Sequence, residues 1–580
     1  MGTPVRTGPP AFMAALGLTA SPGSASPILQ PETQTPESTA NSQTGPLNGI
    51  CVFSGGTAAN SLVDAFQAVA SHMSDRDSIT AALASSPGPG PARQPCSLTY
   101  IIPISDNGGS SSELIRFFGG PSVGDIRSRL VRLIPTRDDD ADTSKATETS
   151  TNERAALRAL FEHRLCSSDP NQARIEWLDL VEARHLLWTF VPSATRELIR
   201  AVLNTLNLEI VKRARPSTSV FNFAGASVGN LFLTGARLFS GSFEAAIYLL
   251  SLLCGIPDHV AVLPSINSNF THHISAGLAD GTTIAGQVNI SHPSAPTSLP
   301  DGTRALHALQ ETQAAQGMSA PPTAAAVAQT AISHRSSGGR RERASTAVDF
   351  EDATLPGSLP VLRQPQLAFS KEDEEDLQAR IARVWYINPY GHEIRPQANP
   401  KTLAALRQAE AIIYSIGSLY TSIVPSLVLR GIGAAIEGSR QQKRKKILIL
   451  NSKLDRETGP HSSPMTAADF VRAIVGACKQ SQSDFGSVQD DECQRYVTHL
   501  VYLEPEERRP AGPRVDKTEL GRLGVQCVGV PSQASRKGAD GLSAGTEADQ
   551  KLQERYDEAA LTQTLEGLLD GSWDRPGHEE

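Results

Sequence analysis

Two short loops carry the residue types that bind phosphate. Ser54-Gly55-Gly56-Thr57 follows one short apolar run, and the stretch from Ile416 to Pro425 follows another. Glycines let backbone N–H groups approach a phosphate closely, and a helix N-terminus adds partial positive charge. The candidate ligand contacts in these loops are Gly55, Gly56, Thr57, Gly417, Ser418, Thr421 and Ser422. Neither loop has the dinucleotide-binding pattern GxGxxG or the P-loop pattern GxxxxGK[ST]. For the first loop, an ordinary tight turn without a ligand is therefore as good an interpretation as phosphate binding.

A third loop, 105–111, combines one carboxylate, one amide, two glycines and three hydroxyl groups. A capped turn would use the same residue types, but so many of them in one turn favour a ligand loop. Asp125, in Gly124-Asp125-Ile126, is either a second acidic ligand or a plain N-cap. Asp106 and Asp125 together could hold one Mg²⁺, which binds one or two carboxylates plus phosphate oxygens. The other candidates here are Asn107, Gly108, Gly109 and Ser110.

A fourth stretch, 225–230, opens a helix with small residues and one amide. Its candidate ligand contacts are Ser227, Gly229 and Asn230. The alternative is that the small residues only allow close helix packing. His272 and His273 have no Cys or acidic neighbours, and we expect them to be structural.

Apolar runs and helical patterns alternate along much of the chain. Strands are expected at 49–53, 98–104, 259–263, 384–387, 411–416, 446–450, 499–503 and 525–530, and Asp280-Gly281 predicts a hairpin turn. Helices are expected at 126–133, 196–211, 228–239, 402–408, 427–437, 467–478 and 557–569. The alternation predicts an α/β fold, a Rossmann-like three-layer sandwich with a mostly parallel sheet, an added β-hairpin and a helical subregion. Ligands then bind beyond the carboxyl ends of the strands.

Composition divides the 580 residues into five segments. Residues 1–47 are expected to be a disordered extension, and 296–372 a low-complexity disordered insertion. Residues 48–295 and 373–530 form two parts of one α/β domain, and 531–580 hold a linker and a C-terminal helix.

The charge balance and the cysteines exclude several classes of protein. With 53 Lys and Arg against 61 Asp and Glu, the net charge is −8, which argues against a nucleic-acid partner. The 7 dispersed cysteines argue against a disulfide framework or a zinc ribbon. No apolar run reaches the roughly 20 residues of a membrane span. We therefore expect a cytoplasmic protein with no membrane partner; whether it forms a homodimer stays open.

Together and in this order, the loops resemble the CofD/YvcK superfamily. CofD is the 2-phospho-L-lactate transferase of deazaflavin coenzyme biosynthesis, and YvcK is a bacterial gluconeogenesis factor that binds sugar nucleotides. The matching stretches are Gly49–Thr57, Ile101–Leu130, Asn222–Leu233, Leu263–Ile290, Ser415–Gly433 and, for an Asn…Glu-Thr segment, Asn451–Thr458.

The resemblance implies one of two functions. The first is a transferase that moves a phospholactyl-type group from a nucleotide diphosphate to a deazaflavin-type or other hydroxyl acceptor. Asp106 and Asp125 would then be catalytic through Mg²⁺, and the backbone N–H groups of 55–57 and 417–421 would cradle the diphosphate. The second is a non-catalytic regulator that binds a UDP-N-acetylglucosamine type ligand, which the YvcK-like spelling of the loops favours. Asn107 favours it too, because the family pattern has Asp there and the loss of an acidic group weakens metal-assisted chemistry more than nucleotide binding. A nicotinamide oxidoreductase is the least favoured alternative, because GxGxxG is absent.

Overall fold

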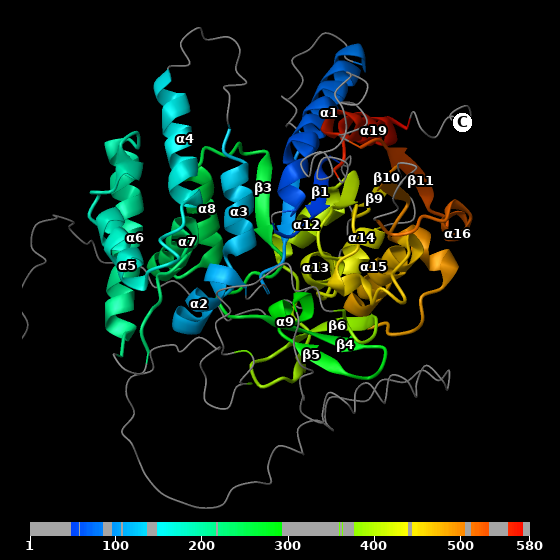
Figure 1. Ribbon diagram of the computed structural model, residues 1–580. Coiled ribbons are helices and arrows are strands. Elements are labelled where there is room, and N and C mark those ends of the chain that lie inside the picture. Colours follow the sequence, from blue (N-terminus) through cyan, green and yellow to red (C-terminus); the bar gives the residue numbers. More distant parts are fainter. Residues whose placement is uncertain are drawn as a thin grey trace, which may run out of the picture. The chain divides into compact units, whose positions relative to one another are not determined.

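Seven parallel strands form the central sheet of the computed structural model, in the order β11-β10-β9-β8-β1-β2-β3 (Figure 1). All residues of β1, β2 and β8 are buried, as expected for strands covered on both faces. The strands are β1 Ile50–Phe53, β2 Leu98–Ile102, β3 Val260–Pro264, β8 Ala411–Tyr414, β9 Lys445–Ile449, β10 His499–Leu503 and β11 Gln526–Val530. The α/β prediction is confirmed.

The structure describes residues 48–56, 58–84, 96–105, 108–135, 148–215, 219–292, 359, 362, 376–438, 444–504, 512–532 and 555–571. The expected extension at 1–47 lies outside them, and so does most of the expected insertion at 296–372. Within the described residues, none of the helices is both long and apolar enough to cross a bilayer.

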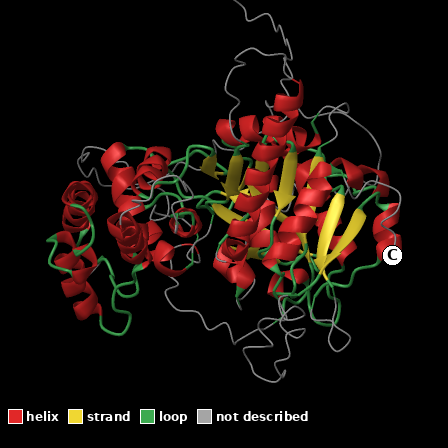
Figure 2. Cartoon of the chain, turned by 90° about the horizontal axis from the view of Figure 1, so that it is seen from above, coloured by secondary structure: helices red, strands yellow, loops and turns green. Residues whose placement is uncertain are grey.

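Helices lie on both sides of the parallel strands (Figure 2). Those of the first half of the chain are α1 Val63–Ala84, α2 Gly109–Phe118, α3 Gly124–Arg132, α4 Glu148–Glu162, α5 Pro170–Val181, α6 Ser193–Arg213, α7 Val228–Ser240, α8 Phe243–Leu253 and α9 Gln287–Ser291. Those of the second half are α12 Pro400–Gln408, α13 Val424–Leu427, α14 Ile432–Glu437, α15 Ala467–Ser481, α16 Lys517–Arg522 and α19 Glu558–Asp570. Short turns of helix are η1 Ala58–Leu62, η2 Leu186–Trp188, η4 Leu419–Ile423, η5 Arg456–Thr458 and η6 Asp490–Arg495.

The helical subregion consists of α4 to α8. Helix α7 is its centre, because it is buried from Val228 to Arg237 and packs against α4, α6 and α8. The helices expected at 196–211 and 228–239 are α6 and α7, so both predictions are confirmed.

A second, antiparallel sheet has the order β5-β4-β6-β7. Its strands are β4 His273–Leu278, β5 Thr283–Ala285, β6 Ile381–Ile387 and β7 Glu393–Ile394. The predicted hairpin turn is confirmed: Gly281 has φ +86°, and the backbone and hydroxyl of Thr282 donate to Asp280.

Two expectations about this region were wrong. The strand expected at 384–387 was assigned to the parallel sheet, but as β6 it pairs with β4, because the hairpin offers it an open edge. The helix expected at 427–437 is interrupted at Gly431, whose φ of +94° separates α13 from α14.

A small cluster covers part of the antiparallel sheet. Leu362 is buried against Trp385, Ile387 and Ala285, and Leu359 packs beside them. The backbone N–H of Leu359 donates to the carbonyl of Pro389 at 2.8 Å. These two leucines lie inside the segment expected to be a low-complexity insertion, so that part of the segment contributes apolar contacts to the domain.

Candidate nucleotide-binding site

Strand β1 is the point at which the chain order of the sheet reverses. It pairs with β2 on one side, through Phe53 and Ile101, and with β8 on the other, through Phe53 and Tyr414. The connections that leave β1 and β8 therefore diverge, and open α/β sheets bind ligands in the crevice at such a point. Both predicted phosphate loops begin there, one after β1 and one after β8.

The two loops touch each other. A Cβ added to Gly55 would lie 2.5 Å from Cβ and Oγ of Ser422. Gly417 has φ +140° and faces the same side chain, with its Cβ position 3.5 Å from Cβ of Ser422. The structure thus brings together predicted residues from distant parts of the sequence. Within the described residues, the N–H groups of Gly55 and Gly56 make no hydrogen bond.

Asp125 reaches the first loop from helix α3. Its Oδ1 lies 2.9 Å from the position that a Cβ on Gly56 would occupy. The N-cap of α3 is Val123, so the plain N-cap alternative for Asp125 is wrong. Asp106, Asn107 and Thr57 lie outside the described residues, as do the side chains at 109 and 110, so their roles stay predictions.

The loop before α7 meets α3 beside Asp125. Nε of Arg127 donates to Oδ1 of Asn230 at 3.1 Å. Gly229 allows this approach, because a Cβ there would lie 2.7 Å from Cγ of Arg127 and 2.6 Å from the carbonyl oxygen of Phe161. Gly229 thus allows close packing, and Asn230 orients the guanidinium of Arg127. Ligand contact by either residue stays a prediction. Ser227 is fully buried, and its hydroxyl makes no hydrogen bond within the described part of the chain.

Arg127 is a candidate ligand contact that the sequence did not single out. Burial, and then the nearby Arg164, lower its pKa to about 10, although Glu162 and Asp125 oppose the shift. Among the described residues, its only side-chain hydrogen bond is the one to Asn230. A guanidinium so placed favours an anionic ligand, because phosphate oxygens replace the lost hydration.

The loop after β8 differs from the expectation in one respect. The N–H groups of Tyr420 and Thr421 both donate to Oε2 of Glu457 at 3.0 Å, and the Thr421 hydroxyl donates to Oε1 at 2.5 Å. The N–H of Gly417 donates to Asn451 at 3.0 Å, and Asn451 donates back to the Gly417 carbonyl at 2.8 Å. The diphosphate cradle expected from the N–H groups of 417–421 is wrong at these three positions, because protein acceptors already occupy them.

Glu457 is thus a buried hydrogen-bond acceptor that shapes the loop. It is 1% exposed and also accepts a hydrogen bond from Ser291 at 2.8 Å. Burial and the neighbouring Asp455 raise its pKa to about 8, although the hydrogen bonds from the Thr421 and Ser291 hydroxyls and the Tyr420 backbone oppose that shift. The Ser418 hydroxyl hydrogen-bonds to the carboxylate of Asp455. Burial raises the pKa of Asp455, and this hydrogen bond opposes the shift. The Asn…Glu-Thr spelling of 451–458 was the sequence signal for this support, but it did not reveal the partners.

Arg129 is a buried cation that holds both ends of the first loop. It is 1% exposed, donates to Oγ of Ser54 and to the carbonyl of Ala59, both at 3.2 Å, and stacks over Tyr100 at 4.6 Å. Burial lowers its pKa to about 10. The buried cation holds the start of the Gly55-Gly56 loop in place and adds positive potential beneath it.

Comparison with known proteins agrees with this arrangement. The family model described as 2-phospho-L-lactate transferase CofD matches residues 50–531. The chain belongs to the CofD family. The match runs from β1 to the end of β11, so the CofD region includes both sheets and every loop described above.

This CofD-family chain also has similar relatives in fungi and bacteria. It is 34% identical over 495 residues to the uncharacterized protein YNL011C of Saccharomyces cerevisiae, a match that covers 83% of this chain and 95% of that protein. It is 36% identical over 133 residues to a putative gluconeogenesis factor of Nostoc, covering 23% of this chain and 27% of that one. A solved UPF0052-family structure from Bacillus halodurans aligns at 18% identity with a TM-score of 0.43, covering 84% of this chain and 93% of that one.

Proposed function

We propose that the crevice between β1 and β8 binds a nucleotide diphosphate and that the protein transfers the phosphorus-containing group it carries to a hydroxyl acceptor. The observation that carries the proposal is the loop after β1. Gly55 and Gly56 present two N–H groups at the topological switch point, between Ser422 and Asp125, and neither group hydrogen-bonds to any residue that the structure describes. N–H groups at this place in an α/β sheet favour an anion.

Family membership supports the choice of reaction. In a CofD-type transfer, the acceptor hydroxyl oxygen attacks the phosphorus that bears the lactyl group. The bond from that phosphorus to the bridging oxygen breaks, a nucleoside monophosphate leaves with the oxygen, and the hydroxyl proton passes to solvent. Such a reaction needs positioning and charge neutralisation more than a covalent nucleophile. The N–H groups of Gly55 and Gly56 would hold the diphosphate, and Arg127 would neutralise part of its charge.

Mg²⁺ is part of the proposal. A carboxylate that faces a phosphate-binding loop suits a hard cation, and Asp125 faces Gly56. Asp125 would hold the ion, with Asp106 as the expected second ligand, and the ion would neutralise charge on the diphosphate. The negative charge of Asp125 favours the charged form of both Arg127 and Arg129, so its carboxylate lies within electrostatic range of two cations.

The test uses the full-length protein and a panel of GDP, UDP and UDP-N-acetylglucosamine, with Mg²⁺ and with chelator. A ligand at a hundred times its Kd stabilises a cooperative domain by about 2.7 kcal/mol, which a thermal-shift assay resolves. The panel is repeated on Gly56→Val, in which a side chain fills the proposed phosphate position. We expect a shift for wild type and none for folded Gly56→Val. Equal shifts would remove this loop from the site.

A second candidate function is binding of a sugar nucleotide without transfer. The YvcK-like spelling of the loops supports it, together with the match over 133 residues to the Nostoc protein described as a putative gluconeogenesis factor. Release of nucleoside monophosphate separates the two functions: a transferase given a nucleotide diphospho-lactate and a deazaflavin acceptor releases it with turnover. A regulator binds its ligand, and the ligand is recovered intact.

A further inference from the structure

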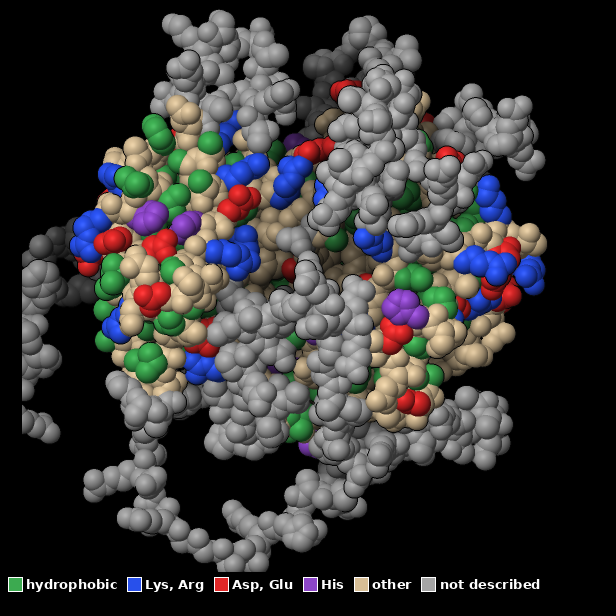
Figure 3. Space-filling view, viewed as in Figure 1, with side chains coloured by type: hydrophobic (Ala, Val, Ile, Leu, Met, Phe, Trp, Pro, Cys, Tyr) green, Lys and Arg blue, Asp and Glu red, His purple; other side chains and the backbone are tan. Residues whose placement is uncertain are grey.

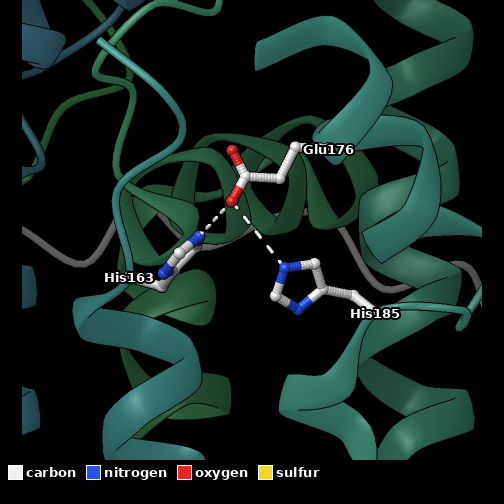
Figure 4. Close-up of side chains that lie close together, drawn as sticks. All are labelled: His163, Glu176 and His185. Atoms are coloured by element: carbon white, nitrogen blue, oxygen red, sulfur yellow. Dashed lines mark hydrogen bonds and ion pairs between the residues drawn. The ribbon is translucent and has the colours of Figure 1, made fainter. Parts of the chain in front are cut away.

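Two histidines and a glutamate meet in the helical subregion. His163 follows α4, Glu176 lies on α5, and His185 precedes η2. One side-chain nitrogen or oxygen from each lies within 4.8 Å of those of the other two. Figure 4 shows both imidazole rings directed at the same carboxylate oxygen. Histidine side chains reach the surface on the side where α4 and α5 lie (Figure 3).

The spacing is close to that of a metal site. Nε2 of His163 lies 2.6 Å from Oε1 of Glu176, and Nε2 of His185 lies 3.7 Å from the same oxygen. Tetrahedral Zn²⁺ with N and O ligands at about 2.0–2.1 Å holds those atoms about 3.4 Å from one another. Shifts of less than about 1 Å would therefore convert these two contacts into coordination distances. The side chains are 28%, 17% and 23% exposed, so an ion can reach them.

We propose that His163, Glu176 and His185 bind one divalent transition-metal ion, with Zn²⁺ as the best chemical match and water in the fourth position. Two imidazole nitrogens and one carboxylate oxygen suit Zn²⁺ far better than Mg²⁺ or Ca²⁺, which require oxygen ligands. The other oxygen of Glu176 accepts the N–H of Cys166 at 2.8 Å, which orients the carboxylate as an outer-shell partner does.

Protons compete with the metal for the same two nitrogen atoms. In the structure, Nδ1 of His185 accepts the N–H of Leu187 at 3.2 Å, which leaves the ring proton on Nε2. Coordination through Nε2 moves that proton to Nδ1, and the bond from Leu187 is given up. Without metal, both rings can donate to Glu176 and the cluster remains a hydrogen-bonded link between segments. The experiment must therefore separate a metal site from such a link.

The location suggests what the ion would do. The segment 163–166 runs beside the loop that leads into α7: Val228 N–H donates to the His163 carbonyl, and Leu165 N–H donates to the Ala226 carbonyl, both at 2.9 Å. An ion on His163 would thus fix the backbone that leads to Asn230. This role concerns loop geometry and does not depend on which reaction the crevice performs.

The test compares full-length wild type with His163→Gln, Glu176→Gln and His185→Asn, each freed of metal with chelator. His185→Asn keeps a good helix cap and removes the imidazole, so it separates loss of metal binding from loss of the turn. The exposed His259, which has no side-chain hydrogen bond in the described part of the chain, provides the control His259→Asn. Circular dichroism checks that each variant is folded.

Zinc binding is measured by calorimetry, and Co²⁺ is added as a spectroscopic probe of tetrahedral coordination. We expect wild type and His259→Asn to bind one more Zn²⁺ per chain than the three cluster variants, or to bind it at least tenfold more tightly. We also expect the tetrahedral Co²⁺ bands to disappear in the cluster variants. The same stoichiometry and affinity in all five proteins would overturn the proposal and leave a hydrogen-bonded link only.

Discussion

The Cβ that Gly55 lacks would lie 2.5 Å from Cβ of Ser422. No real Cβ tolerates such a separation, so the loops after β1 and β8 can close on each other only because residue 55 is glycine. The contact joins the two halves of the candidate site across the point at which the strand order reverses.

We expect Gly55→Ala to push the two loops apart and to reduce both nucleotide affinity and the free energy of unfolding. Overpacking a well-packed site costs about 1–3 kcal/mol. Ser422→Gly removes the atoms that clash, so the double variant should recover part of the loss, measured as a coupling energy in urea unfolding. Gly521→Ala is the control, because a Cβ there meets nothing within 4 Å. Wild-type stability and affinity in Gly55→Ala would contradict the close contact.

Asp125→Asn keeps the size and hydrogen bonding of the side chain but removes its charge. If Asp125 holds Mg²⁺ against a diphosphate, nucleotide affinity with Mg²⁺ should fall at least tenfold, or about 1.4 kcal/mol, and affinity in chelator should hardly change. Calorimetry in both conditions measures this. Asp258→Asn, at an exposed position, is the control. Unchanged Mg²⁺ dependence would remove Asp125 from the metal site.

Arg127→Gln removes the guanidinium beside Asn230 without emptying the space. We expect weaker binding of a nucleoside diphosphate and unchanged binding of the corresponding nucleoside, because the lost interaction is with phosphate charge. The loss should shrink at high salt, where charges are screened. An equal loss for the nucleoside and the nucleotide would indicate that Arg127 acts only through loop packing.

The pH dependence of stability should report Glu457. Its pKa is raised from 4.5 to about 8, so the folded state retains a proton that the unfolded state loses. The contribution of protonated Glu457 to the free energy of unfolding is full below about pH 4.5 and is lost as pH rises through about 8. Each unit of difference between the folded and unfolded pKa corresponds to about 1.36 kcal/mol of that free energy. Urea unfolding at about pH 6 and about pH 9 should show a larger decrease for wild type than for Glu457→Gln. Parallel profiles would contradict the assignment.

Two deletions test the segment before β6. Removing 296–355 keeps Leu359 and Leu362, whereas removing 296–370 exposes the apolar face of Trp385 that they cover. We expect the shorter deletion to leave the melting temperature near that of wild type. The longer one should lower stability by about 2–5 kcal/mol, as for the loss of a buried leucine. Equal stability of the two deletions would mean that the leucines contribute little.

Much of the fold follows from local patterns in the sequence. Short apolar runs ending in glycine and hydroxyl residues predicted β1, β2 and β8, and Asp280-Gly281 predicted the hairpin, because burial and turn geometry depend on neighbouring residues. Three candidate ligand loops could be placed at strand ends for the same reason. The sequence by itself therefore determined the α/β class, and it singled out Gly55, Gly56 and Ser422 as candidate site residues.

The partners of those residues were decided by the tertiary structure. Strand order puts β8 beside β1, and only then does Ser422 meet Gly55 and Asp125 meet Gly56. The sequence contains no local sign that Glu457 occupies the N–H groups of Tyr420 and Thr421, or that β6 pairs with β4. Hydrogen-bond partners and strand neighbours are long-range contacts, and local propensity does not determine which distant segment supplies them.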